Sequence, residues 1–475
     1  MKLLLVGVDL RDGIVSLALP QLAAYLRAQP DLAAAVAVET RVFWPNHSAQ
    51  AVAQQVIAAR PDLLGVSLFV WSEPLLADAL HRICAALPAL RVVLGGPQVQ
   101  ARVRHWFKQS ASIVAVIEGE GEQPLAELVR RLVHAEPLTG IGGVHARGRQ
   151  PVLSPPAAPP AIATLRQMPS VYLSGSLLPP TNVAYVETAR GCPYRCGYCD
   201  FGHQKRQVRY RRWSVVEQEL RWLRDHGVDS LVFIDPVFNA APRRPLAILR
   251  LARQLGFTGF SAQIRAELLG EALAAELGRC QALVGVGLQS TNAAAQRLMG
   301  RACPAARFER GVAWLKQHGV AFKLQLVCGL PGDTFEGFCN SLDAALAFDP
   351  VAVEAFTLQV LPGTRFYLDA KHLGLRFDRR PPHELIATPT LDRQTLFEAR
   401  GIAQLAFQLH FQPRVRAAMQ SASSRGVRQT KIYRALAERA VATGALAPER
   451  LLIAGEPFRS DEVRRLCTLL EQLVA

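Results

Sequence analysis

Three cysteines lie within eight residues, Cys192, Cys196 and Cys199, directly after the apolar, strand-like run Val183–Glu187. Three thiolates on one loop can bind three irons of a [4Fe-4S] cubane and leave the fourth iron without a protein ligand. A small molecule can chelate that open iron, which would make the cluster reactive. A structural zinc site takes four ligands in two pairs, and here only His203 has the spacing to complete one. The triplet therefore favours a reactive iron–sulfur cluster over zinc.

The spacing Cys-x3-Cys-x2-Cys, with the aromatic Tyr198 before the last cysteine, resembles the signature of the radical S-adenosylmethionine (SAM) superfamily. The resemblance implies that Cys192, Cys196 and Cys199 bind a [4Fe-4S] cluster and that the amino and carboxylate groups of SAM occupy the fourth iron. It also implies that Tyr198 packs near the SAM adenine, although an aromatic residue at this position could instead belong to the core. The triplet is thus expected to be both the metal site and the catalytic centre.

The chain around the triplet alternates between strand-like and helix-like patterns from residue 182 to residue 370. Short apolar runs predict six strands with helical stretches between them. The strands are expected at Val183–Glu187, Ser230–Asp235, Gly259–Ile264, Leu283–Leu288, Ala321–Val327 and Ala355–Val360. Such a series suits a partial (βα)6 TIM barrel, which carries its chemistry at the carboxyl ends of the strands. The cysteines follow the first strand, where that rule places a site.

The later strand ends carry the residues that, by the same resemblance, would hold SAM. They are Asp235, Gln263, Arg265, Gln289, Ser290 and Leu330. The region of Asp235 holds the SAM amino group in the superfamily, although the usual Gly-Gly-Glu is absent here. Arg265 could bind the SAM carboxylate through two hydrogen bonds, or it could form an ion pair with Glu267. Gln289 and Ser290 resemble the family's Gly-x-Gln-Ser turn near the ribose, and Leu330 lies in a glycine-flanked turn beside the adenine.

The first 136 residues also alternate between strands and helices. Leu3–Val8 is an unbroken apolar run, typical of a strand buried on both faces. Further strands are expected at Val36–Phe43, Leu63–Phe69, Arg91–Leu94 and Ile113–Glu118. The alternation predicts a doubly wound, Rossmann-like open parallel sheet whose ligand crevice lies at the carboxyl ends of its strands.

Three turns at those strand ends suit a bulky ligand. They contain Ser67, the run Gly95, Gly96 and Pro97, and the pair Gly119 and Glu120. Paired glycines let the backbone approach a ligand closely. Upstream of a radical SAM motif, these turns together resemble the cobalamin-binding domain of cobalamin-dependent radical SAM enzymes. The loop Asp9–Gly13 lacks the histidine that ligates cobalt in many cobalamin domains, so we expect base-off cobalamin without a protein histidine.

Composition and pattern divide the chain into four segments. They are a cobalamin-binding domain over 1–136, a linker rich in Pro, Ala, Gly and Ser over 137–181, a radical SAM partial barrel over 182–370 and a helical extension over 371–475. The expected fold class is therefore α/β, with a Rossmann-like domain, a partial barrel and C-terminal helices. The extension either caps the barrel mouth and recognises substrate or forms an ordinary solvated bundle. Val360–Thr364 and Pro381–Leu385 resemble one largely uncharacterised branch of the family.

Composition also limits the cellular compartments and the partners expected for the protein. The 475 residues carry a formal net charge of +15, and their apolar runs are too short to span a membrane. The apolar N-terminus meets Asp9 and Arg11 at once, unlike a signal peptide. The six cysteines outside the triplet have no framework spacing, which indicates a reducing, cytoplasmic compartment. The basic stretch Lys205–Arg212 could bind a phosphate, a carboxylate or a leader peptide, or it could be a solvated loop. The net positive charge permits a nucleic-acid partner, but we do not expect one.

The resemblance implies a cobalamin-dependent radical SAM enzyme that methylates an unactivated carbon of a natural-product or peptide substrate, using a 5′-deoxyadenosyl radical and methylcobalamin. The alternative is a cyclisation or rearrangement with the same cofactors and no net methyl transfer. A cobalamin- or zinc-binding regulatory protein would not need the matching strand-end turns. A tRNA-modifying methylthiotransferase would need a second cysteine triad, whereas the first 136 residues contain only Cys84. The resemblance further implies an electron donor such as flavodoxin or ferredoxin.

Overall fold

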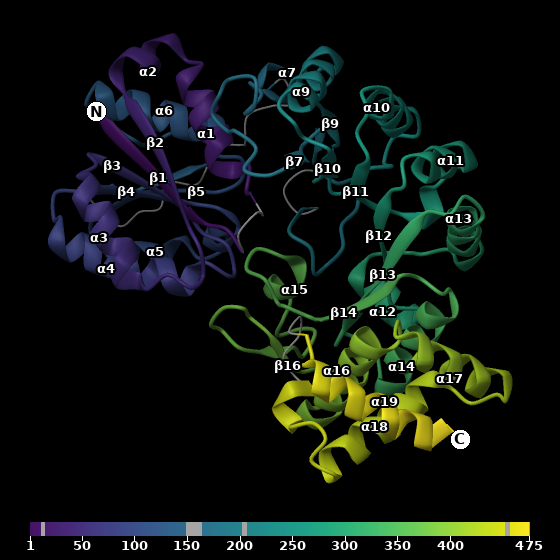
Figure 1. Cartoon of the computed structure of the whole chain (residues 1–475). Coiled ribbons are helices and arrows are strands. Elements are labelled where there is room, and N and C mark those ends of the chain that lie inside the picture. Colours follow the sequence, from purple (N-terminus) through teal and green to yellow (C-terminus); the bar gives the residue numbers. More distant parts are fainter. Residues whose placement is uncertain (11–14, 149–163, 202–206, 452–456, 475) are drawn as a thin grey trace.

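The computed structural model of the chain describes residues 1–10, 15–148, 164–201, 207–451 and 457–474. Two six-stranded sheets, each with its own helices, lie side by side, and a bundle of C-terminal helices packs against the second sheet (Figure 1). The fold class predicted from the sequence is confirmed: an α/β chain with a Rossmann-like domain, a partial barrel and a helical C-terminus.

The first sheet has the strand order β2-β1-β3-β4-β5-β6. Its strands are β1 (Lys2–Val8), β2 (Ala37–Phe43), β3 (Leu63–Ser67), β4 (Arg91–Gly95), β5 (Ile113–Ile117) and β6 (Val144–Ala146). All neighbouring pairs are parallel except β5 and β6. The crossover connections to both sides of β1 create a topological switch point, and ligands of such sheets bind beyond the carboxyl ends of the strands.

Helices cover both faces of this sheet (Figure 1). On one face lie α1 (Ala18–Arg27), α2 (Pro30–Ala35) and α6 (Glu122–Val133). On the other lie α3 (Ala49–Ala59), α4 (Glu73–Ala86) and α5 (Val103–Gln109). Alternate residues of β1 enter the two cores, Leu3 and Leu5 on the side of α1, and Leu4 and Val6 on the side of α3. Burial of both faces explains why this strand is an unbroken apolar run.

Two elements fall within the segment 137–181 that composition predicts as a linker. Strand β6 pairs antiparallel with β5, with Val144 opposite Ile117, and helix α7 (Thr164–Gln167) follows later. Three residues are too few to leave a period-two pattern in the sequence. Residues 149–163 lie outside the described part of the chain. The first sheet therefore extends past residue 136, the end predicted for the domain.

The second sheet has the order β14-β13-β12-β11-β10-β7, with every neighbouring pair parallel. Its strands are β7 (Val183–Val186), β10 (Ser230–Phe233), β11 (Gly259–Ile264), β12 (Leu283–Gln289), β13 (Ala321–Cys328) and β14 (Ala352–Thr357). The helices between them are α9 (Trp213–Asp225), α10 (Arg243–Gln254), α11 (Glu271–Arg279), α12 (Ala293–Met299), α13 (Ala305–Gln317) and α14 (Phe335–Ala347). Six parallel strands in chain order form the predicted partial barrel.

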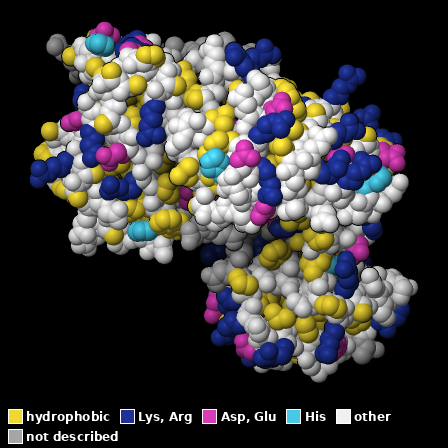
Figure 2. Space-filling model, turned by 45° about the horizontal axis from the view of Figure 1, so that its top comes forward, with side chains coloured by type: hydrophobic (Ala, Val, Ile, Leu, Met, Phe, Trp, Pro, Cys, Tyr) yellow, Lys and Arg dark blue, Asp and Glu magenta, His cyan; other side chains and the backbone are white. Residues whose placement is uncertain are grey.

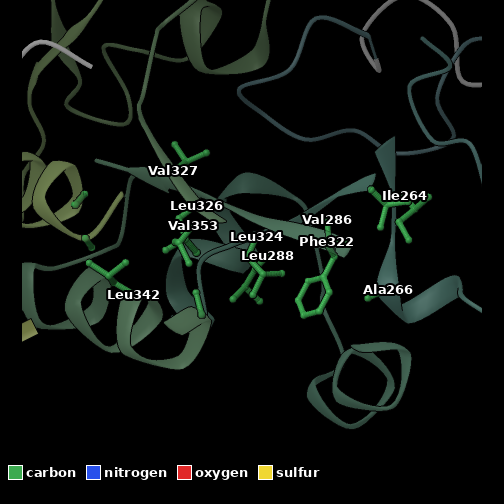
Figure 3. Packing of buried hydrophobic residues seen from close by; sticks show 14 of the residues in the cluster. Ile264, Ala266, Val286, Leu288, Phe322, Leu324, Leu326, Val327, Leu342 and Val353 are labelled. Atoms are coloured by element: carbon green, nitrogen blue, oxygen red, sulfur yellow. The ribbon is translucent and has the colours of Figure 1, made fainter. Parts of the chain in front are cut away.

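One side of this sheet is a continuous apolar core. Figure 3 shows Leu324 and Leu326 of β13 among Val286 and Leu288 of β12, Val353 of β14 and Leu342 of α14. Strand β14 pairs with β13, with Phe356 opposite Val327. It begins at Ala352, three residues before the predicted range Ala355–Val360. The predicted range is displaced because β14 is an edge strand with polar and exposed residues, whereas Leu358 and Val360 in the loop after it are buried.

The C-terminal extension packs on the edge of the partial barrel. After α15 (Arg365–Leu368) and the hairpin β15 (Arg376–Phe377) and β16 (Leu385–Ala387) come four helices. They are α16 (Arg393–Leu409), α17 (Pro413–Ser424), α18 (Gln429–Ala442) and α19 (Ser460–Val474). Helix α16 lies along β14 and shares the barrel core through Leu396 and Ile402. The extension therefore covers the sheet edge that β14 would otherwise expose. None of the helices described is long and apolar enough to cross a membrane.

Candidate active site

The cysteine triplet lies on a loop held from both sides at Gly197. The Gly197 N–H donates to the Met299 carbonyl at the end of α12, and its carbonyl accepts from the Phe366 N–H in α15, each over 2.8 Å. A Cβ at position 197 would lie 2.4 Å from Cε1 of Phe366. Glycine between Cys196 and Tyr198 is thus required by packing, and the loop joins two elements more than 60 residues apart in the chain.

The thiols of the triplet are held in an apolar setting. Cys192 and Cys196 are buried and Cys199 is half-buried. Burial raises the pKa of Cys192, and burial raises the pKa of Cys199 to about 12. The protein environment therefore favours the neutral thiols of Cys192 and Cys199, and a bound cation would favour their thiolates.

The arrangement of the triplet is compatible with a cluster. Among the described residues, no three His, Cys, Asp or Glu side chains converge on a position that one metal ion could take. A cubane binds each thiolate to a different iron, so the three sulfurs need not converge. His203, the candidate fourth ligand of a zinc site, lies outside the described ranges.

A buried arginine that sequence reasoning missed lies beside the triplet. Arg301 is 8% exposed and donates from Nη2 to the Gly287 carbonyl, and its Nε has no hydrogen-bond partner among the described residues. Burial lowers the pKa of Arg301, but the neighbouring Tyr198, Cys196 and Glu267 outweigh burial and raise it overall. Its only signal in the sequence is its place directly after α12, which carries the loop contact at Met299.

Arg265 forms the predicted ion pair with Glu267, and one of its nitrogens stays unpaired among the residues described, for the other predicted role, binding the SAM carboxylate. Its Nε donates to Glu267 over 2.7 Å, and its guanidinium lies 3.6 Å from the ring centroid of Tyr194 in the cysteine loop. Asn239 fixes the Arg265 backbone through two hydrogen bonds. Arg265 Nη1 and one Glu267 oxygen are buried without a partner in the described structure. One guanidinium N–H group is thus available to a ligand.

Asp235 supports the entry to the cysteine loop. Its carboxylate accepts hydrogen bonds from the Thr188 N–H over 2.7 Å, from the Ala189 N–H over 3.0 Å and from the Thr188 hydroxyl. Burial raises the pKa of Asp235 to about 6, against the lowering effect of these hydrogen bonds. Both oxygens hold the segment that leads into strand β8 (Ala189–Arg190), two residues before Cys192.

The remaining predicted strand-end residues fall into two groups. Gln263 and Gln289 lie against Gly285 and Gly287 of β12, where a Cβ would approach either amide to 2.4 Å. Ser290 is fully buried and donates to Asp333 over 3.0 Å, and Leu330 is fully buried. The two glutamines therefore occupy space that the glycines leave open, whereas Ser290 joins β12 to the turn after β13.

The turns predicted to bind cobalamin pack closely together at the carboxyl ends of strands in the first sheet. Gly96 has φ +92°, and a Cβ there would lie 2.5 Å from the carbonyl oxygen of Leu68. Ser67 pairs with Gly95 at the ends of β3 and β4, and a short 3-10 turn (Pro97–Val99) starts at Pro97. Gly119 has φ +91° in the turn after β5. Asp9 folds the end of β1 back by accepting from the Ser16 N–H, and residues 11–14 of that loop lie outside the described residues.

Comparisons with known families identify both halves of this arrangement. Residues 5–129 match the model described as a B12 binding domain, and residues 186–345 match that of the radical SAM superfamily. The chain belongs to the radical SAM enzymes that carry a B12-binding domain. Its cofactors are cobalamin, a [4Fe-4S] cluster and SAM. The two matched ranges contain all the strand-end turns and the cysteine triplet described above.

Among similar proteins are two curated methyltransferases. The chain is 30% identical over 217 residues to the cobalamin-dependent radical SAM methyltransferase TokK of Streptomyces tokunonensis, covering 43% of this chain and 32% of TokK. It is 31% identical over 209 residues to the 2-(S-pantetheinyl)-carbapenam-3-carboxylate methyltransferase of Streptantibioticus cattleyicolor, covering 41% and 30%. The chain thus spans about a third of the length of these relatives.

A solved structure shares the fold over nearly the whole chain. The cobalamin-dependent SAM radical enzyme OxsB, determined with aqua-cobalamin and SAM bound, has a TM-score of 0.69 and 13% sequence identity. The similarity covers 99% of this chain and 83% of OxsB. At this identity it supports the order and packing of the three parts.

In this radical SAM enzyme, ion pairs join the B12-binding domain to the cysteine loop. Glu120 binds Arg209 through both carboxylate oxygens and lies 3.8 Å from Arg190, while Glu122 lies 2.7 Å from the same Arg190. Arg190 is also bound by Glu187 at the end of β7. Burial lowers the pKa of Arg190, but these carboxylates outweigh burial and raise it well above its usual value. Glu120, predicted as a cobalamin contact, is thus a domain-joining residue in this structure.

The basic stretch after the triplet is only partly the solvated loop that one interpretation predicts. Arg209 and Arg211 are buried, and Arg211 lies 3.0 Å from Glu219. Residues 202–206 lie outside the described part of the chain. The partner of Arg209, Glu120, comes from the distant B12-binding domain, whereas the partner of Arg211, Glu219, lies in helix α9 directly after this stretch.

A second contact reaches from the cobalamin turn to the C-terminal extension. Gln98 donates to Glu73 over 2.8 Å and lies 2.6 Å from Nε2 of His383, which is fully buried. Arg102 completes the group with two hydrogen bonds to Glu73. The segment 95–102 therefore touches both the expected cobalamin crevice and the loop before β16.

Proposed function

We propose that the chain is a cobalamin-dependent radical SAM C-methyltransferase that acts on an unactivated carbon of a natural-product or peptide substrate. The observation that carries the proposal is the joining of the B12-binding turns to the cysteine loop through Glu120, Glu122, Arg190 and Arg209. Two similar proteins are named as methyltransferases. Methylation is therefore favoured over cyclisation or rearrangement.

The chain's own residues have separable tasks in this reaction. Cys192, Cys196 and Cys199 would hold the cluster, and Arg265 Nη1 is the buried donor suited to the SAM carboxylate. Gln263 and Gln289, over Gly285 and Gly287, would orient SAM, with Leu330 as an apolar wall. When bound, the cluster and SAM supply a radical able to take a hydrogen atom, and cobalamin supplies the methyl group.

The B12-binding side would position cobalamin by shape. Ser67, Gly95, Gly96, Pro97 and Gly119 lie on turns where backbone can approach a large ring. Tyr198, next to Arg301 and packed near Phe366, would close the SAM side against water. We further propose a cytoplasmic enzyme with a flavodoxin- or ferredoxin-type electron donor; the cysteines are free thiols in the structure.

The test uses the full chain, reconstituted with iron, sulfide and hydroxocobalamin and supplied with a reductant and candidate substrates chosen from its gene neighbourhood. A methyltransferase forms 5′-deoxyadenosine, S-adenosylhomocysteine and methylated product in equal amounts, and the product gains one methylene unit. A product of changed connectivity without that gain would establish the cyclase instead. Turnover without cobalamin would refute both. Cys196→Ala abolishes 5′-deoxyadenosine, whereas Cys280→Ala, at a free cysteine of the barrel core outside the triplet, leaves it unchanged.

A further inference from the structure

An arginine-lined groove lies outside the interface between the B12-binding domain and the partial barrel. It has a volume of about 830 Å³ and is bordered by Arg166 of α7, Arg211, Arg212, Arg243 and Arg244. None of its lining residues is acidic. Arg166, Arg212 and Arg243 are exposed and have no ion-pair partner in the described ranges. The groove thus concentrates positive charge that the described protein does not neutralise. Figure 2, which turns the upper part of the molecule forward, shows Lys and Arg side chains over much of this face.

Two helices begin at this groove. Helix α9 starts at Trp213 and α10 at Arg243, and neither has a side-chain cap on its first N–H groups. Helix N-termini leave backbone N–H groups unpaired and carry partial positive charge, a combination that binds anions. Arg212 and Arg243 thus add full charges where two helix dipoles already favour a negative ligand.

The inner wall of the groove contains donors that the protein does not use. The Arg211 side chain is 4% exposed and paired with Glu219, yet its Nε and Nη2 have no partner among the described residues. Arg244 lies over the ring of Tyr210, donates to the Arg211 carbonyl over 2.8 Å and leaves its Nε unpaired. Leaving buried donors unpaired is unfavourable, and a ligand with several acceptor oxygens would offset that cost.

The position of the groove separates it from the cofactor sites. Strand β9 (Arg209–Tyr210) pairs with β8, and successive side chains of a strand point to opposite faces. Arg209 points to Glu120 of the B12-binding domain, whereas Tyr210 points into the groove. The two sites share a hairpin that leads into the cysteine loop, but they do not share side chains.

We propose that this groove binds a phosphate-class anion, either free or carried by a small organic phosphate. Arginine forks and helix N-termini both match the geometry of phosphate oxygens. A volume of about 830 Å³ suits a small molecule. A single-stranded nucleic acid would instead need a long basic track with stacking platforms.

The test is calorimetric titration of the full-length, cluster-reconstituted protein with pyrophosphate, ribose 5-phosphate and ribose. The two phosphates should bind and ribose should not; pyrophosphate alone binding would assign a free anion, and ribose 5-phosphate binding more tightly would assign an organic phosphate. Arg212→Gln with Arg243→Gln should weaken phosphate binding at least tenfold. The control is Arg221→Gln with Arg250→Gln, an equal charge change on exposed positions of the same helices, which should stay within twofold.

Three outcomes would overturn the proposal. They are equal binding by the two double variants, absence of phosphate binding in the wild type, and tighter binding of a uridine oligonucleotide than of ribose 5-phosphate through the same arginines. The pair Arg212→Lys and Arg243→Lys keeps both charges and should retain most of the affinity, which separates loss of charge from loss of fold. Because no cofactor is needed for binding, the result is independent of whether the chain methylates anything.

Discussion

At the scale of single residues, Arg301 is the group most directly placed to influence the cluster. It is buried beside Cys196 and Tyr198, and its Nε is unpaired among the described residues. A reduced cluster carries one more negative charge than an oxidised one, so a neighbouring cation stabilises the reduced form. We predict that Arg301→Gln makes the cluster's midpoint potential more negative by roughly tens of millivolts, measured by a redox titration followed by electron paramagnetic resonance.

The matched control for this prediction is Arg297→Gln, on the exposed side of α12, which should leave the potential unchanged. Arg301→Lys should restore part of the shift, since it keeps the charge but loses the planar donor set. An unchanged potential in Arg301→Gln, with full cluster content, would show that Arg301 has only a packing role.

Asp235 gives a second residue-scale prediction, concerning pH. Its folded pKa of about 6 lies above the ordinary value of 3.8. A group of raised folded pKa contributes stability below its unfolded pKa and loses it as pH rises through the folded pKa. Nearby Glu187 adds to the raised pKa, while Arg244 faces the same carboxyl. Between pH 4 and pH 7 the wild type should therefore lose roughly 3 kcal/mol of unfolding free energy relative to Asp235→Asn.

The measurement is urea unfolding of both proteins at several pH values in that range. The asparagine variant lacks the titrating group but keeps a side chain of the same shape, so common effects of other carboxyl groups cancel in the difference. Parallel pH profiles for the two proteins would contradict the assignment of this titration to Asp235.

At the scale of elements, the cysteine loop depends on two elements that hold it. Gly197 lies between the end of α12 and α15, with no room for a Cβ beside Phe366. We predict that Gly197→Ala displaces the loop, costs about 1–3 kcal/mol of stability and lowers the iron and sulfide bound per chain. Adding Phe366→Leu should recover part of the cluster content. Gly270→Ala, where a Cβ would meet open space, is the control and should bind a full cluster.

The elements also show what could be read from sequence. Strand β1 is a long apolar run and β13 alternates apolar with polar residues, and the predicted ranges of both agree with the structure to within about a residue. The edge strand β14 was displaced by three residues and β6 was missed, because edge strands are short or partly polar and their place depends on pairing. The cysteine triplet was readable because its ligands are adjacent in sequence. Arg301 was not, because only the contact of Met299 with Gly197 brings it to the loop.

At the scale of the whole molecule, the two cofactor-binding halves are joined by charge. Glu120 and Glu122 extend from the turn after β5, and Arg190 and Arg209 extend from the hairpin that flanks the triplet. Arg190 and Arg209 are largely buried, so removing one partner leaves a buried charge uncompensated. The sequence shows both groups of charges but gives no register between them, so the ion pairs of Glu120 could not be predicted, and its contact with cobalamin stays a prediction.

The last prediction concerns this junction. Glu120→Gln and Arg209→Gln should each lower the unfolding free energy, and the double variant should lose less than the sum, because the second change removes a charge already unpaired. Glu127→Gln, which breaks partly exposed pairs with Arg130 and Arg131 within α6, should cost less than about 1 kcal/mol. In the reconstituted enzyme, a loosened junction should raise the ratio of 5′-deoxyadenosine to methylated product, because SAM cleavage needs only the barrel while methyl transfer needs both halves in register. Additive stability losses with an unchanged product ratio would show that Glu120 and Arg209 do not set the alignment of the two halves.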